Sequence, residues 1–119
     1  SIPACKEGYE TIFRLSRLSI PTFATGITSP KQGFLAIQAG ARYIEPLISE
    51  MNGWEELESI KKILSHSKQE TDIIIGSLND VSEMIRCFEM GFDGVNLSKA
   101  LFDELLESPA EALRWPFTN

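Results

Sequence analysis

Polar side chains that could hold a ligand follow the apolar, strand-like runs of this sequence. In parallel α/β folds, the carboxyl ends of the strands meet at one edge of the sheet, and binding and catalytic residues gather there. Small hydroxyl and amide groups suit a polar, polyhydroxylated or phosphorylated ligand, although the same residue types also cap helices. The residues selected by this rule are Thr25, Thr28, Ser49, Glu50, Ser77, Asn79, Asn96 and Ser98.

The residue types that serve in acid–base catalysis, metal binding and nucleotide binding do not form a recognisable motif in this sequence. His66 is the only histidine and lies near the end of a helical run, so we interpret it as a solvated residue and not as a general base. Together with Cys5 and Cys87 it does not have the spacing of a metal site, and the sequence has neither a P-loop nor a GxGxxG motif. We therefore predict no metal and no cofactor.

Short apolar runs alternate with longer segments of helical period, which is the pattern of a parallel α/β sheet. Three consecutive isoleucines at 73–75 are typical of a buried parallel strand. The predicted strands are residues 20–25, 42–48, 72–77 and 93–97, and the predicted helices are residues 7–18, 30–39, 53–65, 81–90 and 100–113.

Several helix ends carry explicit boundary residues. Ser29 precedes a proline and is expected to be an N-cap, and Asn52 is expected to cap the helix that follows it. Gly40 and Gly91 each follow a helical run and precede a strand, so both fit a left-handed helix terminus.

Size and composition predict one domain, residues 1–119, with average globular usage of 43% hydrophobic and 24% charged residues. Eleven Lys and Arg against 17 Asp and Glu give a net charge of -6, which argues against nucleic acid or an anionic membrane as a partner. No apolar run is long enough to span a membrane. We interpret Cys5 and Cys87 as free, packed thiols of a cytoplasmic protein.

A helix followed by four strand–helix units is half of an eight-stranded TIM barrel, which typically needs about 250 residues. Such a half has two unpaired edges and one uncovered face. We therefore predict an α/β half-barrel of four parallel strands alternating with helices, closed by association with its own copies or by a missing N-terminal half. A rearranged, doubly wound sheet stays open as an alternative.

Three segments resemble, in order, the transaldolase family, closest to its small members that act as fructose-6-phosphate aldolases. Residues 2–8 (IPACKEG) look like the family segment after the Schiff-base lysine. Residues 20–25 (IPTFAT), continuing to 32–33 and 39–41, resemble the next strand and helix, and residues 74–79 (IIGSLN) resemble a later strand end. The resemblance covers nearly the whole chain.

This resemblance implies a class I aldolase of sugar-phosphate metabolism, in the pentose phosphate pathway, whose lysine forms an imine with a ketose phosphate without a metal. By position, Thr25 matches a strand-end threonine of the active site, and Ser77 matches a serine that helps hold the substrate phosphate. The lysine position falls on Ser1, and a serine hydroxyl cannot form an imine. Lys6 is close in sequence, but it lies beyond the strand.

Other departures concern the phosphate. Glu50 stands where the family has an arginine, Asn79 where it has a basic residue, and Leu47 where the small aldolases have a tyrosine. Losing two cations and gaining a carboxylate weakens the binding of a phosphate dianion, because each charged hydrogen bond contributes about 1.5–3 kcal/mol. We therefore predict a transaldolase-like chain that is inactive or incomplete, with a sugar phosphate as its ligand if it is active.

The alternative is a non-catalytic α/β structural or binding module that self-associates. The aromatic residues at 115–117 (WPF) favour it, because an aromatic cluster left exposed is a costly apolar patch unless a neighbour covers it. Its partners are then copies of itself, in a homo-oligomer, or a complementing half-barrel. A flavodoxin-like receiver domain is disfavoured, because the first predicted strand lacks the acidic cluster of a phosphoacceptor site.

Overall fold

The computed structural model describes residues 1–106, in which five strands alternate with five α-helices. All strand pairs are parallel, and the order in the sheet is the order in the chain. The strands are β1 (Ile2–Pro3), β2 (Phe23–Ile27), β3 (Tyr43–Pro46), β4 (Asp72–Ile75) and β5 (Gly94–Val95). The helices are α1 (Lys6–Arg17), α2 (Pro30–Ala39), α3 (Trp54–Ser65), α4 (Val81–Glu89) and α5 (Lys99–Leu106), with a 3₁₀ turn η1 (Ile48–Glu50) after β3.

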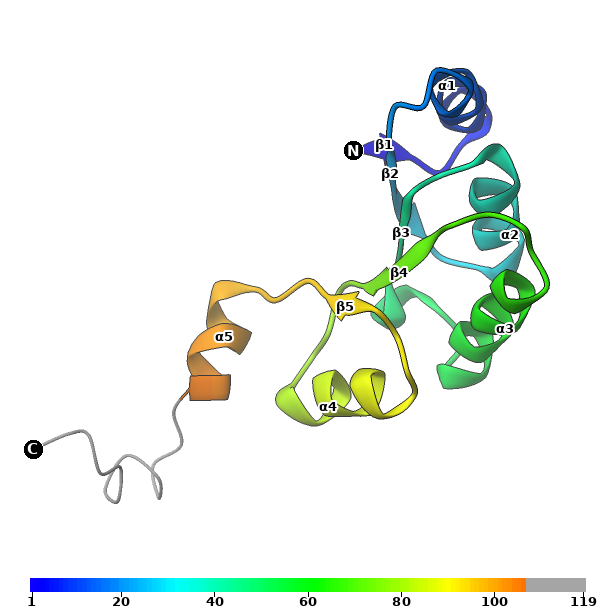
Figure 1. Cartoon of the computed structure of the whole chain (residues 1–119). Coiled ribbons are helices and arrows are strands. Elements are labelled where there is room, and N and C mark those ends of the chain that lie inside the picture. The colour runs from blue at the N-terminus through cyan, green and yellow to red at the C-terminus, as the bar shows by residue number, and fades with distance from the viewer. Residues whose placement is uncertain (107–119) are drawn as a thin grey trace, which may run out of the picture.

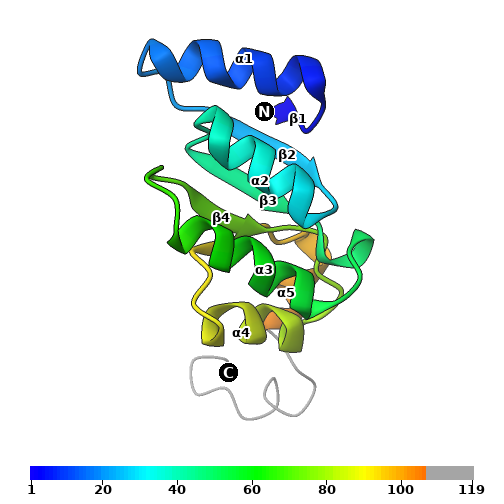
Figure 2. The ribbon, with the colours of Figure 1, turned by 90° about the vertical axis from the view of Figure 1, so that its right-hand side faces the viewer.

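The helices that follow the first three strands lie on one side of the sheet (Figures 1 and 2). Helix α1 packs against α2, and α2 packs against α3, so these helices form one layer beside the strands. Helix α5 extends away from that layer (Figure 1). A parallel sheet with its helices on one side is the arrangement of part of a TIM barrel, as predicted, whereas a doubly wound sheet has helices on both faces.

The hydrophobic core lies between the strands and the helices. Ala24, Ile44 and Ile73 face the helices from three neighbouring strands and are at most 1% exposed. From the helical layer, Ile37 and Leu57 are fully buried against them. Because a fully buried Leu or Ile side chain contributes about 1.5–3 kcal/mol, each of these residues stabilises the contact between the two layers.

The opposite face of the sheet is covered by no helix among the described residues. Phe23 and Tyr43 lie there side by side, with their rings stacked 5.8 Å apart, and both are half-buried. The guanidinium of Arg42 lies 4.7 Å from the centre of the Tyr43 ring. In a complete barrel this face lines the interior.

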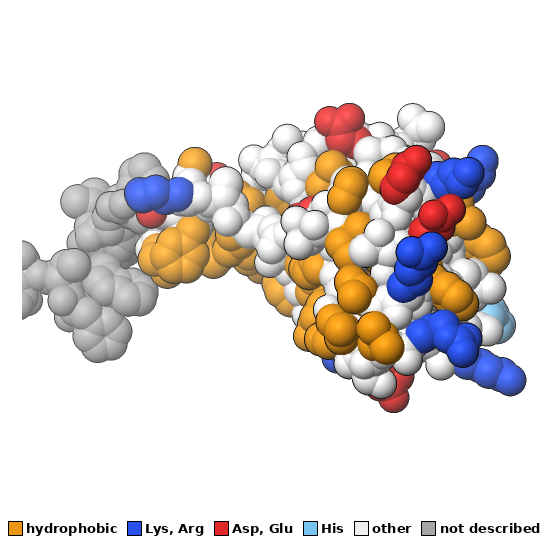
Figure 3. All heavy atoms as spheres, turned by 90° about the horizontal axis from the view of Figure 1, so that it is seen from above, with side chains coloured by type: hydrophobic (Ala, Val, Ile, Leu, Met, Phe, Trp, Pro, Cys, Tyr) orange, Lys and Arg blue, Asp and Glu red, His pale blue; other side chains and the backbone are white. Residues whose placement is uncertain are grey.

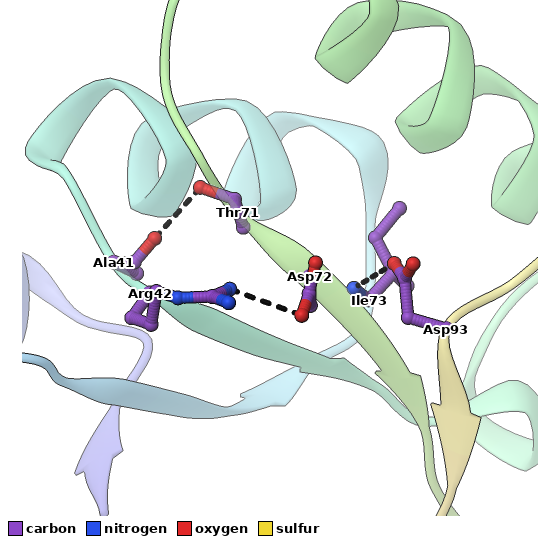
Figure 4. Close-up of polar contacts among 6 residues, drawn as sticks. All are labelled: Ala41, Arg42, Thr71, Asp72, Ile73 and Asp93. Carbon is purple, nitrogen blue, oxygen red and sulfur yellow. Dashed lines mark hydrogen bonds and ion pairs between the residues drawn. The ribbon is translucent and has the colours of Figure 1, made fainter.

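Polar contacts join β3, β4 and β5 at the amino ends of the strands (Figure 4). Thr71 Oγ1 donates to the Ala41 carbonyl at 2.7 Å, Arg42 pairs with Asp72 at 3.0 Å, and the Ile73 N–H donates to Asp93 Oδ2 at 2.8 Å. The polar side chains at the amino ends of the strands are therefore engaged in contacts within the chain. We expect a functional site at the carboxyl ends of the strands instead.

Most of the predicted helix boundaries are confirmed. The Ser29 side chain accepts a hydrogen bond from the Gln32 N–H at 3.3 Å, as an N-cap should. Gly40 and Gly91 have φ angles of 98° and 84°, the left-handed conformation expected where a helix ends.

Several expectations about the secondary structure are wrong. The cap of α3 is Gly53 and not Asn52, which instead donates its backbone N–H to the Glu56 carboxylate. Residues 20–22 are not part of a strand, because Ser19 turns the chain at a φ of 58° and β2 begins only at Phe23. The described sheet has five strands and not the four predicted, because residues 2–3 pair with β2 and form β1.

Of the two thiols, Cys87 is buried as expected, whereas Cys5 is exposed and does not pack in the core. The end of the last predicted helix and the aromatic cluster at 115–117 lie outside the described residues. No helix within residues 1–106 has the length and apolar character needed to span a membrane.

Candidate functional site

Thr25 lies in an irregular part of β2. The register of β2 against β3 shifts between Ala24 and Ile27, so Thr25 and Gly26 stand opposite a single residue, Glu45. Gly26 has a φ of 73°, which accommodates the extra residue. Because Ala24 is fully buried against the helices, the alternation of side chains places Thr25 on the face without helices, next to Glu45.

Glu45 reaches from β3 across β4 to the residue that follows β5. The Asn96 side-chain amide donates a hydrogen bond to Glu45 Oε2. Gly76 lies beneath this carboxylate, and a Cβ atom there would stand 2.6 Å from the same oxygen. The missing side chain at position 76 is therefore what lets the carboxylate cross the strand.

Asn96 is one of the residues predicted from the sequence, whereas Glu45 is not. A charged residue on the barrel-facing side of a strand, followed by a glycine at the end of the next strand, is the signal that could have found the pair.

Ser49 and Ser77 are brought together by the fold. Their hydroxyl groups share a hydrogen bond between η1 and the segment after β4. The Ile48 N–H donates to the Gly76 carbonyl at 3.0 Å, which fixes the two segments against each other. Ser77 has a φ of 61°, an uncommon conformation for a residue with a side chain, and such residues cluster at functional sites.

Three other predicted residues serve local structure. Thr28 Oγ1 donates to a glutamine of α2 at 2.9 Å, and Ser98 accepts the Leu101 N–H at 3.1 Å as a cap of α5. Asn79 donates its backbone N–H to the Glu83 carboxylate at the start of α4, and its side chain is exposed.

Ser1 immediately precedes β1 and is exposed. Pro3 pairs with Thr25, and the alternation along an extended chain places Ser1 and Pro3 on the same face as Thr25. Lys6 lies instead in the first turn of α1, in the helical layer. The fold therefore places Ser1, and not Lys6, on the face that carries Thr25 and Glu45.

Two carboxylates at the carboxyl edge, those of Glu45 and Glu50, form no ion pair with any residue in the described range 1–106. Glu50 is exposed in η1, and Glu45 lies beside Gly76. The ion pairs within residues 1–106 are Arg42 with Asp72 and Lys99 with Asp103, and neither includes these two carboxylates.

The metal-ligating residue types and the Cys87 thiol lie outside this edge or in isolated positions among residues 1–106. Within the part of the chain that the structure describes, no three His, Cys, Asp or Glu residues are grouped to hold a metal ion. His66 follows α3 and borders an open hollow of about 720 Å³ between α2 and α3, in the helical layer. Burial raises the pKa of the Cys87 thiol to about 11, so it is not a nucleophile at neutral pH.

Sequence comparison places this arrangement among known proteins. The family profile described as Transaldolase/Fructose-6-phosphate aldolase matches residues 2–115. Similar proteins include those described as probable transaldolases from Petrotoga mobilis, Clostridium tetani and Aquifex aeolicus, which are 32%, 29% and 29% identical over 113 residues. These alignments cover 91% of this chain and 51–53% of those proteins, so the chain spans about half the length of the curated relatives that it matches.

Proposed function

The chain belongs to the transaldolase and fructose-6-phosphate aldolase family, and we propose that it is a sugar-binding half-barrel of that family that does not itself form the imine. We further propose that residues 1–119 act as one domain. The observation that carries the proposal is the serine at position 1, on the face of the sheet that carries Thr25.

The covalent step of a class I aldolase needs an amine on the barrel-facing side of the sheet. The motif at 2–8 assigns this position to Ser1, which offers a hydroxyl group instead. Lys6 belongs to the first turn of α1, in the helical layer, and not to β1, whose Pro3 pairs with Thr25. For Lys6 to form an imine at this position, it would therefore have to leave α1.

Ligand binding does not require the amine. The family suggests a sugar phosphate of the pentose phosphate pathway as the ligand. In this chain, the hydroxyl groups of Thr25 and Ser77 and the amide of Asn79 would contact it. We place the protein in the cytoplasm, where the free thiols Cys5 and Cys87 stay reduced.

Borohydride trapping tests the proposal. The full chain is incubated with dihydroxyacetone or fructose 6-phosphate, reduced, digested and mapped by mass spectrometry. We expect no adduct on the native chain and an adduct at position 1 of Ser1→Lys. A native adduct that disappears in Lys6→Arg would refute the proposal, because the lysine of α1 would then replace the missing amine. A chain unfolded in urea controls for non-specific modification.

A second candidate, a self-associating structural or binding module, is favoured by the open face and by exposed apolar side chains. Seen from the α1 end, hydrophobic side chains lie at the surface among lysines and arginines (Figure 3). Phe13 and Leu18 in this region are 50% and 69% exposed, and Phe102 and Leu106 of α5 are 48% and 66% exposed. A homo-oligomer or a complementing half-barrel would cover such groups. Sedimentation of the chain as a monomer at micromolar concentration would argue against this candidate.

A further inference from the structure

The Glu45 carboxylate is held in a defined position at the carboxyl edge of the sheet. It crosses β4 above Gly76, accepts a hydrogen bond from the Asn96 amide, and stands opposite Thr25 in the bulge of β2. Glu45 is half-buried and Gly76 is buried.

We propose that Glu45, positioned by Asn96, binds the hydroxyl groups of a neutral, polyhydroxylated ligand such as an unphosphorylated ketose, and that this edge prefers the neutral sugar to its phosphate ester. The inference rests on the proposed function, because it takes the carboxyl edge of the sheet as the sugar site.

The chemistry of the neighbouring groups matches a polyol. The amide of Asn96 occupies one position on Glu45 Oε2, and the remaining lone pairs of the carboxylate can accept hydroxyl hydrogens. Hydrogen bonds from a hydroxyl to an ionised carboxylate are short and about twice as strong as neutral ones. Thr25 and the joined hydroxyl groups of Ser49 and Ser77 add donors and acceptors on either side.

The same geometry disfavours a phosphate group. The family motif assigns Ser77 to the phosphate, and Ser77 directly follows Gly76. The Glu45 carboxylate occupies the space next to Gly76 where a Cβ atom would otherwise lie. Glu50 adds a second carboxylate at this edge, and neither ion pair described within residues 1–106 neutralises them. At an effective dielectric constant of about 20–40, repulsion between such charges a few ångströms apart reduces affinity by about tenfold or more.

Binding to the full chain can be measured by ¹H–¹⁵N NMR titration with D-fructose and with fructose 6-phosphate at equal ionic strength. We expect D-fructose to bind about tenfold more tightly than its phosphate ester, with shifts at Thr25 and Asn96. Glu45→Gln keeps the size of the side chain and removes its charge, so it should weaken fructose binding and abolish the preference. Glu58→Gln makes the same charge change on the exposed side of α3 and should alter neither affinity.

Gly76→Ala supplies a second test, because it keeps the charge and displaces the carboxylate. Loss of fructose binding in this variant supports the proposal. The proposal is overturned if the native chain binds neither sugar, if it binds the phosphate ester more tightly, or if Glu45→Gln binds fructose as the native chain does. If the native chain binds fructose 6-phosphate more tightly and borohydride traps no imine, this inference is refuted and the proposed function stands. If borohydride traps an imine on the native chain, the proposed function is refuted, whichever sugar binds more tightly.

Discussion

Replacing Gly8 by alanine should separate α1 from β1. Gly8 is buried in the first turn of α1, and an added Cβ would stand 1.9 Å from the carbonyl oxygen of Pro3 and 3.2 Å from a side-chain atom of Ile2. Because the nearest atom belongs to the backbone, no change of rotamer relieves the contact. Ordinary contact begins at about 3.4 Å, so the helix must move by about 1.5 Å.

The magnitude follows from opposing effects. Alanine favours a helix over glycine by about 1 kcal/mol. Forcing an extra carbon into a packed site costs about 1–3 kcal/mol. The displacement also loosens Ile12, which is fully buried against the sheet and contributes about 1.5–3 kcal/mol. We therefore expect the free energy of unfolding to fall by about 2 kcal/mol.

Urea unfolding of the full chain, followed by far-ultraviolet circular dichroism, measures this change. Gly33→Ala in α2 is the matched control, because its Cβ would meet only side-chain atoms of Ile60, at 3.1–3.3 Å, and these can shift. We expect the control to change the stability by less than about 1 kcal/mol. A Gly8→Ala variant as stable as the native chain would show that α1 does not rest on β1 in this way.

Four further predictions follow, two from single hydrogen bonds and two from the burial of Cys87. Ser29→Ala removes the N-cap of α2 and should lower the free energy of unfolding by about 1 kcal/mol in urea, whereas an unchanged midpoint would contradict the cap. Thr71→Val leaves the Ala41 carbonyl without its buried partner and should cost about 1–2 kcal/mol in the same assay; a neutral result would mean that water replaces the hydroxyl. In the native chain, a thiol reagent at pH 8 should modify Cys5 and spare Cys87, and equal labelling would contradict the burial of Cys87. Because the pKa of Cys87 rises from 9.0 to about 11 on folding, the unfolded thiol ionises first, so stability should fall more steeply between these pH values in the native chain than in Cys87→Ala, in which the raised pKa of the partly buried Tyr9 still contributes.

Where local chemistry decides the structure, the sequence was sufficient to predict it. Helix α2 has its predicted bounds because Ser29 caps one end and Gly40 turns the other. Strand β1 could not be predicted in this way, because two residues ending in Pro3 carry no strand pattern of their own. Only pairing with β2 makes them a strand, and proline is tolerated there because β1 lies at the edge of the described sheet.

In the candidate site, too, the residues in segments with a recognisable local pattern could be predicted from the sequence, and the others could not. The rule that function gathers at the carboxyl ends of strands selected Ser49 and Ser77, and the fold joins their hydroxyl groups. The rule could not select Glu45, because the residue lies inside β3. Its position depends on Gly76, 31 positions later in the chain, and on the register shift in β2. Such a contact between strands is not encoded in the pattern of any one segment.

The departures from the family pattern form a physically consistent set. An enzyme that joins its substrate through an imine gains from holding the phosphate as well, because a fixed phosphate keeps the carbonyl group within reach of the amine. Under the proposed function, Ser1 stands at the amine position, and a bound phosphate would then no longer serve that step. Glutamate at position 50 and asparagine at position 79 stand where the resemblance places cations that hold the phosphate. If Glu45 gives the same edge an acceptor for hydroxyl groups, as we propose, one physical cause would account for both the loss of covalent chemistry and the change in ligand preference.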